Sequence, residues 1–371
     1  DPMRAISEFQ EALIYRPDWE VAALARAQVQ ARQSTASAID GLDKFVARNP
    51  DARDARLALA RLLIVERRYD DARVQFDRLL KNSRDNPDIV YPLAVLALQQ
   101  GDKAVARAQL DKLLAADFAD KNTIHFFLGQ LDEEEKKPEA ALEHYRRVTG
   151  GDQYIPARAR AAHLLLAQGR TEEARELLRT TRTGSAAERT QLILTEAQLL
   201  REAGRGDESH ALLESALAGN PDNLELLYET ALAAERQGKP EVTEKHLRRL
   251  LALKPDHAHG LNALGYSFAD RNMRLAESYD LISRAVALAP DDPFIMDSMG
   301  WVLFRQGRLP EALATLEKAY ALRPDPEIAI HLGEVLWTMG RKDEAARFLK
   351  EAAGKFPDSE VLAAALKKFR P

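Results

Sequence analysis

The dipeptide Pro-Asp recurs at intervals close to 34 residues, and this period constrains the fold more than any other feature of the sequence. From Pro221 to Pro357, successive copies lie 33 to 35 residues apart. All of its positions are Pro17, Pro50, Pro87, Pro221, Pro255, Pro290, Pro324 and Pro357. A second marker has the same period, because several glycines are each followed five residues later by alanine, serine or threonine. These glycines are Gly101, Gly169, Gly204, Gly238, Gly307 and Gly340. Two independent markers with one period predict an internal repeat rather than two or three unrelated globular domains.

Each period has the pattern of two α-helices joined by a short turn. In the first helix, a glycine such as Gly300 lacks a side chain and would let the second helix approach closely. Gly307, at the end of that helix, is expected to be a left-handed residue. In the second helix, Ala312, Leu316 and Ala319 form one apolar stripe. Proline then stops the helix, and a neighbouring Asp or Asn is expected to cap the next one.

A helix–turn–helix repeat of this length resembles the tetratricopeptide repeat family over essentially the whole chain. The resemblance implies an all-α fold, a solenoid of antiparallel helix pairs stacked into a right-handed superhelix. We expect residues 1–18 to be the second half of an incomplete repeat, 19–357 to form ten repeats, and 358–371 to be a capping helix. The expected starts are Trp19, Arg53, Pro87, Asn122, Ile155, Thr190, Leu224, Ala258, Pro293 and Pro326. The first repeat is irregular, because Arg26 stands where the pattern has a small residue.

Composition and motifs narrow the class of function. With 53 basic and 58 acidic residues, the chain gives no electrostatic reason to expect nucleic acid as a partner. No apolar run approaches the roughly 18 residues that a membrane span needs, and the absence of cysteine excludes disulfides and thiol catalysis. Phosphate-loop, zinc-protease, calcium-loop and serine-hydrolase motifs are missing. We therefore expect a non-catalytic scaffold without cofactor or metal; an enzyme would need a catalytic domain upstream.

The first helix of each repeat carries a second row of side chains, on the face that its partner helix does not use. Three successive repeats near the C-terminal end place aromatic residues there. Stacking would align these rows along the inner, concave wall, and aromatics with Arg and carboxylates are typical of a peptide-binding hot spot. Alternatively, each ring fills space between adjacent first helices. The candidate partner-binding residues are Tyr91, Phe126, Tyr228, Asn262, Tyr266, Phe294, Asp297, Trp301, Phe304, Arg305, Glu334 and Trp337.

Three C-terminal segments resemble a narrower group within this family. They are Leu261–Asp270, Pro290–Trp301 and His331–Trp337, and they are similar to tetratricopeptide outer-membrane lipoproteins of Gram-negative bacteria that bind the carboxyl-terminal processing protease. The resemblance covers about the last third of the chain. It implies a periplasmic adaptor that helps activate this protease and delivers peptidoglycan hydrolases to it. It also implies an outer-membrane anchor, a lipidated cysteine that would lie upstream of Asp1.

Other interpretations of the scaffold stay open. A general scaffold for envelope or polysaccharide-export assembly, in the envelope or the cytoplasm, is compatible with the same repeats. A signal peptide and a lipidation site upstream would favour the protease adaptor. The Lys and Asn pattern by which eukaryotic members of the family clamp carboxylates is not reproduced on the first helices, so chaperone C-termini are not the expected ligand.

Overall fold

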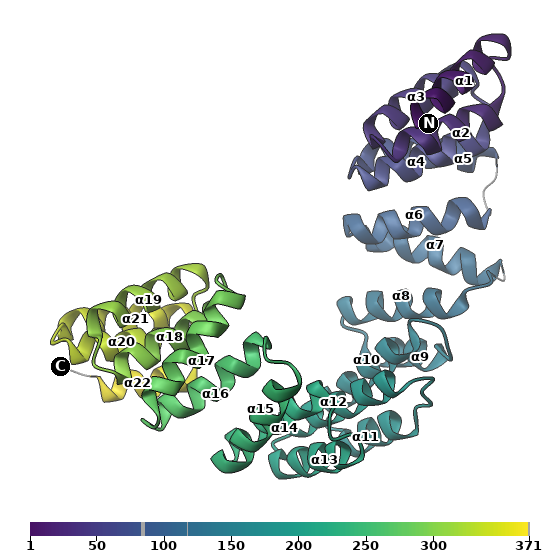
Figure 1. The fold of residues 1–371 in the computed structure, drawn as a ribbon. Helices are drawn as coiled ribbons and strands as arrows, with labels where there is room; N and C mark the ends of the chain where they lie inside the picture. Colours follow the sequence, from purple (N-terminus) through teal and green to yellow (C-terminus); the bar gives the residue numbers. More distant parts are fainter. Residues whose placement is uncertain (83–85, 117, 370–371) are drawn as a thin grey trace. The chain divides into compact units, whose positions relative to one another are not determined.

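The computed structural model describes residues 1–82, 86–116 and 118–369, and these residues form α-helices joined by short turns. No β-strand occurs among them, which confirms the predicted all-α class. The chain divides into two compact units, Asp1–Gly169 and Arg170–Pro371. Successive helices of each unit lie side by side (Figure 1).

The first unit contains α1 (Pro2–Tyr15), α2 (Glu20–Ala31), α3 (Thr35–Arg48), α4 (Arg53–Val65), α5 (Tyr69–Asn82), α6 (Pro87–Gln100), α7 (Lys103–Ala115), α8 (Lys121–Glu134), α9 (Pro138–Arg147) and α10 (Tyr154–Ala167). The second unit contains α11 (Thr171–Thr180), α12 (Ala186–Glu202), α13 (Gly206–Gly219), α14 (Leu224–Arg236), α15 (Pro240–Leu253), α16 (Ala258–Asp270), α17 (Leu275–Leu288), α18 (Pro293–Arg305), α19 (Leu309–Leu322), α20 (Pro326–Thr338), α21 (Lys342–Lys355) and α22 (Glu360–Lys368).

Neighbouring helices pack as pairs, and the pairs pack on one another. In the second unit α16 packs on α17 and α18 on α19, while the first helices of successive pairs also touch, α16 with α18 and α18 with α20. The helix pairs are those of a tetratricopeptide solenoid. Their apolar stripe is buried as predicted, since Ala312, Leu316 and Ala319 have no exposed surface. Full burial of the Leu316 side chain contributes about 1.5–3 kcal/mol.

The two helices of a pair come closest where the first carries glycine. A Cβ added to Gly300 would lie 2.5 Å from Cγ of Leu316, and one added to Gly333 would lie 2.7 Å from Cδ2 of Leu349. This confirms that the missing side chain sets the distance between the helices. Other pairs have a buried alanine at the same place, namely Ala60, Ala94, Ala162, Ala197 and Ala231.

A left-handed residue follows the first helix of most pairs. Gly307 has a φ of 77° and Gly340 a φ of 80°, as predicted. Where the sequence has no glycine, Arg67, Lys136 and Asn272 adopt the same conformation, with φ of 55° to 58°. Helix packing therefore imposes this turn, at a cost of about 1–2 kcal/mol for a residue that has a side chain.

Replacing Arg67 with glycine is accordingly expected to raise the free energy of unfolding by about 1 kcal/mol, because glycine adopts positive φ without strain. Urea denaturation followed by circular dichroism measures the change. The matched control is Glu66→Gly, one residue earlier at a φ of −80°, where glycine only adds unfolded-state entropy and should lower stability. Equal effects of the two substitutions would contradict the explanation.

Polar side chains cap the helices that begin after the proline turns. The Asp292 carboxylate accepts backbone N–H groups at the start of α18, and Asp325 does the same for α20. Helix α12 begins at Ala186, four residues before the repeat start expected at Thr190, because Ser185 caps it there. At the C-terminal end, α22 is capped by Ser359 and buries Leu362 and Phe369 against α20 and α21.

Candidate functional site

The predicted row of aromatic residues lies where α16, α18 and α20 meet. We call this surface the aromatic face, and define it by Tyr266, Phe294, Asp297, Trp301, Phe304, Arg305, His331, Glu334 and Trp337. Its three helices are first helices of successive pairs, so their rows lie side by side. The face therefore brings together residues that are a whole repeat or more apart in sequence.

At its centre, Asp297 of α18 and His331 of α20 form a buried pair. Nδ1 of His331 lies 2.9 Å from both carboxylate oxygens of Asp297. Asp297 is 5% exposed and His331 is 7% exposed. Burial disfavours the charged imidazolium, but the hydrogen bond and negative charge of Asp297 outweigh it, so the pKa of His331 lies above its ordinary value. A charged imidazolium and a carboxylate thus connect adjacent helix pairs.

Trp301 packs on this pair and is itself buried. Its ring stacks on that of His331, with centroids 4.2 Å apart. The ring of Phe304, also on α18, has its centroid 5.0 Å from that of Trp301. Trp301 is only 6% exposed, and its indole N–H is buried without a hydrogen-bond partner among the described residues. Arg305 lies over the same ring, 5.6 Å from its centroid, and donates to the backbone carbonyls of Ala269 and Asp270 at the end of α16. Trp301 and Arg305 therefore stabilise the aromatic face by contacts from α18 to its two neighbours, α20 and the C-terminal end of α16.

Tyr266 extends the cluster from α16 to α20. Its ring centroid lies 6.3 Å from that of His331, and its hydroxyl donates to Oε1 of Glu327 at 3.4 Å. Burial and the nearby carboxylate of Glu327 raise the pKa of Tyr266 well above its ordinary value, so the hydroxyl stays protonated and remains a donor. Nearby on α16, Asn262 has a buried side-chain oxygen without a partner among the described residues.

Other residues of the aromatic face are more accessible. Phe294 is 42% exposed, with the guanidinium of Arg323 lying 5.0 Å from its ring centroid. Trp337 is half-buried against Phe369, with centroids 5.6 Å apart, and the Lys342 ammonium lies 5.1 Å from its ring. Glu334 is bound by Lys368 at 3.4 Å. These side chains offer apolar area and charge of both signs to a partner.

The three candidates further upstream are separate from this cluster. In the first unit, Tyr91 of α6 stacks on Phe118 with centroids 5.6 Å apart, and Phe126 of α8 is buried, 7% exposed. In the second unit, half-buried Tyr228 of α14 lies 5.7 Å from the ring of His257. Each of these rings fills space beside its own neighbours.

Sequence reasoning missed His331 as a site residue, although a signal was present. His331 and Asp297 are 34 residues apart, which is one period. Polar residues one period apart lie on neighbouring first helices, so an acid and a base at this spacing can pair. The hydroxyl of Ser267 on α16 likewise donates to the carboxylate of Glu235 on α14, 32 residues earlier, so polar contacts between neighbouring first helices recur.

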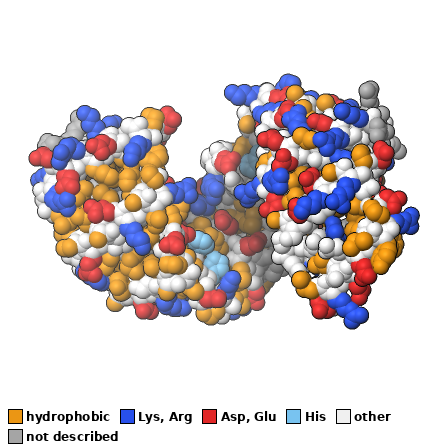
Figure 2. All heavy atoms as spheres, turned by 90° about the horizontal axis from the view of Figure 1, so that it is seen from above, with side chains coloured by type: hydrophobic (Ala, Val, Ile, Leu, Met, Phe, Trp, Pro, Cys, Tyr) orange, Lys and Arg blue, Asp and Glu red, His pale blue; other side chains and the backbone are white. Residues whose placement is uncertain are grey.

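Among the residues that the structure describes, no group of three or more histidines and carboxylates could hold a metal ion. Basic and acidic side chains are interspersed over the visible face of the molecule (Figure 2). Within the same residues, every helix is too short or too polar to cross a bilayer.

Comparison with protein families agrees with the helix pairs. A tetratricopeptide repeat model matches residues 22–87, 91–155, 194–242, 236–293 and 298–360, and a second tetratricopeptide repeat model matches residues 133–183. Most of the chain is therefore covered by repeats of this type.

Two curated relatives are much longer than this chain. The TPR repeat-containing protein PA4667 of Pseudomonas aeruginosa is 40% identical over 205 residues, which are 55% of this chain and 35% of that protein. The cellulose synthase operon protein C of Xanthomonas axonopodis pv. citri is 27% identical over 315 residues, 80% of this chain and 19% of that protein. The chain spans about a third of the first and a fifth of the second.

Two solved structures are similar to this chain. A tetratricopeptide repeat protein from Parabacteroides merdae is 17% identical, with a TM-score of 0.51 over 67% of this chain and 98% of that one. A thermophilic TPR protein of Thermus thermophilus is 26% identical, covering 48% of this chain and 97% of that one with a TM-score of 0.45. The first likeness supports the fold alone.

Proposed function

Because the chain belongs to the tetratricopeptide repeat family, we propose that it is a protein-binding scaffold whose partner is a carboxyl-terminal processing protease. The scaffold would help activate the protease and deliver peptidoglycan hydrolases to it. The protein would act in the periplasm, held at the outer membrane by a lipidated cysteine upstream of Asp1.

The observation that carries this proposal is the convergence of three segments on one site. Leu261–Asp270, Pro290–Trp301 and His331–Trp337 carry the resemblance to protease-binding lipoproteins. Tyr266 of the first, Trp301 of the second and His331 of the third share one cluster on the aromatic face. Segments that resemble one group of proteins thus build one surface.

The contact residues of this surface are its accessible members. Buried Asp297 and Trp301 hold the helices in place, whereas Phe294 and Trp337 have surface to offer. An aromatic ring with an adjacent guanidinium, as in Phe294 and Arg323, is a frequent anchor in protein interfaces.

The test uses the full chain and the purified processing protease of the same organism. We expect binding in isothermal titration calorimetry and faster degradation of a purified peptidoglycan hydrolase when the scaffold is present. Phe294→Ala should weaken binding about tenfold or more, the loss expected for an interface anchor. Val74→Ala, at a 46% exposed position on α5, is the matched control and should bind normally. Absence of binding by the unmutated chain would refute the protease assignment.

The likeness to cellulose synthase operon protein C favours a second candidate function, a scaffold in polysaccharide-export assembly. The alignment covers 80% of this chain. Affinity capture from the native organism separates the two: recovery of polysaccharide-export proteins without the protease would favour this alternative.

A further inference from the structure

Arg26 occupies a position at which every other expected repeat has alanine or glycine. In the pair of α18 and α19, the same position holds Gly300, which lies against Leu316 where the two helices cross. In the first pair, the position lies where α2 crosses α3. The residues at the same position are Ala60, Ala94, Gly129, Ala162, Ala197, Ala231, Gly265, Gly300 and Gly333. A guanidinium therefore stands where the other pairs keep helices in contact through a small residue.

The facing helix compensates for the large side chain. A Cβ added to Gly41 would lie 3.0 Å from Nη2 of Arg26 and 3.2 Å from Oε1 of Gln30. The position of Gly41 holds a larger residue in each of the other expected repeats, namely Gln75, Gln109, His144, Leu177, Leu212, His246, Leu281, Thr315 and Phe348. The first pair thus lacks the small residue on its first helix, α2, and instead has a glycine on its second helix, α3.

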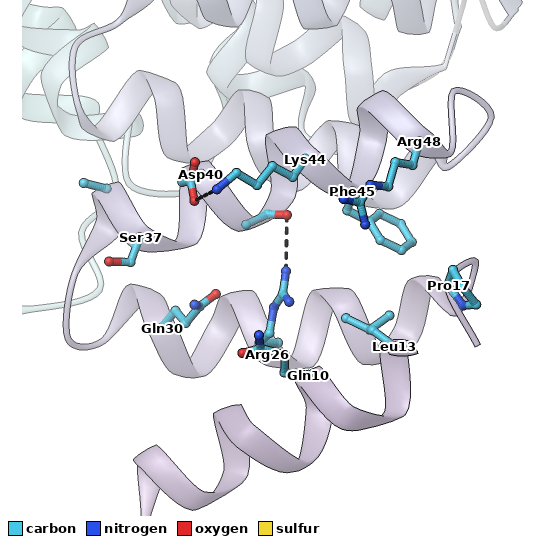
Figure 3. Close-up of a pocket in the computed structure, with 12 residues that line it drawn as sticks. Gln10, Leu13, Pro17, Arg26, Gln30, Ser37, Asp40, Lys44, Phe45 and Arg48 are labelled. Carbon is cyan, nitrogen blue, oxygen red and sulfur yellow. Dashed lines mark hydrogen bonds and ion pairs between the residues drawn. The ribbon is translucent and has the colours of Figure 1, made fainter. Parts of the chain in front are cut away.

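The exchange is accompanied by a cavity of about 600 Å³ between α1, α2 and α3. We call it the Arg26 pocket, and Figure 3 shows Arg26 and Gln30 pointing from one helix towards the helix that carries Asp40 and Lys44. Its lining includes Leu13, Gly41, Phe45 and Arg48.

Two polar atoms in this pocket lack partners. Arg26 donates from Nη2 to the Gly41 carbonyl at 3.2 Å, but its Nε is buried without a partner among the described residues, as is Oε1 of Gln30. Burial lowers the pKa of Arg26, and the charge of Asp40 offsets this only in part. Asp40 itself is bound to Lys44 at 2.7 Å. A buried donor, a buried acceptor and an incompletely compensated cation leave room for an anion with an adjacent N–H group.

We propose that the Arg26 pocket binds the C-terminal end of a peptide chain. The terminal carboxylate accepts hydrogen bonds from Arg26, with Arg48 adding a second positive charge. The N–H group of the last residue donates to Gln30, and an apolar last side chain packs between Leu13 and Phe45. This site lies in the first unit and does not depend on the aromatic face or on the identity of the protease, so either proposal can fail while the other holds.

The direct test follows the Arg26 Nε–H resonance by NMR in the full chain labelled with ¹⁵N-arginine. The probe is N-acetyl-Ala-Ala-Leu with a free carboxylate, compared with the same peptide as a C-terminal amide and with acetate. We expect the free acid to shift the resonance saturably, the amide to bind at least about tenfold more weakly, and acetate to bind more weakly than the acid. Equal binding of acid and amide, equal binding of acetate, or no shift at all would overturn the proposal.

Variants separate recognition from folding. Arg26→Ala places in this pair the residue that Ala60 supplies in the next, and it should lose at least about tenfold in affinity for the free acid. Gln30→Leu should weaken binding of the peptide but leave binding of acetate unchanged. Arg32→Ala, an exposed arginine at the end of the same helix, is the matched control and should bind as the unmutated chain does. If Arg26→Ala does not fold by circular dichroism, Arg26→Lys keeps the charge, removes Nε, and must still weaken binding.

Discussion

Replacing Gly300 with leucine is expected to lower the free energy of unfolding by about 3 kcal/mol or more, the upper range for overpacking a core. A Cβ at this position would already lie 2.5 Å from Cγ and 2.8 Å from Cδ2 of Leu316. Leu316 is fully buried and cannot move aside, so α18 and α19 must separate. Separation would in turn disturb Trp301, the next residue on α18.

Urea denaturation followed by circular dichroism measures this loss. Gly354→Leu is the matched control, because Gly354 lies in α21 with no heavy atom within 4 Å of an added Cβ. There the same substitution should raise stability by up to about 1 kcal/mol through helix propensity. If both variants lost stability equally, close approach at Gly300 would not be the cause.

Removing the carboxylate of Asp297 is expected to cost about 3–5 kcal/mol, the typical penalty for breaking a buried ion pair by deleting one partner. Asp297→Ala leaves the imidazole of His331 buried without its acceptor. Asp297→Asn keeps the shape of the side chain and removes only the charge, so it should cost less than the alanine variant. Urea denaturation of both variants gives the comparison, and an unchanged free energy of unfolding in Asp297→Ala would contradict it.

The pH dependence of this pair has a definite sign. Because the folded-state pKa of His331 lies above its ordinary value of 6.5, the stabilisation is complete below that value and is lost as pH rises through the folded-state pKa. The stability difference between the unmutated chain and Asp297→Asn should therefore shrink from pH 5.5 to pH 9. His125, whose pKa burial lowers, should show the opposite slope in His125→Asn. A difference that grows with rising pH would exclude the proposed charge pairing.

The repeat period allowed the local structure to be predicted. The glycines that end first helices are left-handed, and those at the helix crossings admit the partner helix, because both follow from backbone sterics within one helix pair. The left-handed Arg67 could not be predicted in this way, since its own side chain disfavours that conformation and only the packing of α4 on α5 requires it.

The aromatic face was predictable in position but not in exposure. Helical periodicity placed Trp301 and Asp297 on one face of α18, but whether a ring points to solvent depends on the next pair, which supplies His331. Their contact is set by the stacking of α18 and α20 rather than by either helix alone. The irregularity at Arg26 was likewise visible in the sequence, whereas its pocket depends on the glycine that faces it.

The contact between Tyr266 and the α20 residues His331 and Glu327 joins two helix pairs that are not adjacent in the array. Stacked repeats that touch only their immediate neighbours can open one by one from an end. A link that passes over α18 makes that opening more costly, because either outer pair that leaves must break its contacts with both of the other pairs. These three pairs should then behave as one cooperative unit, a rigid segment within an otherwise stepwise array.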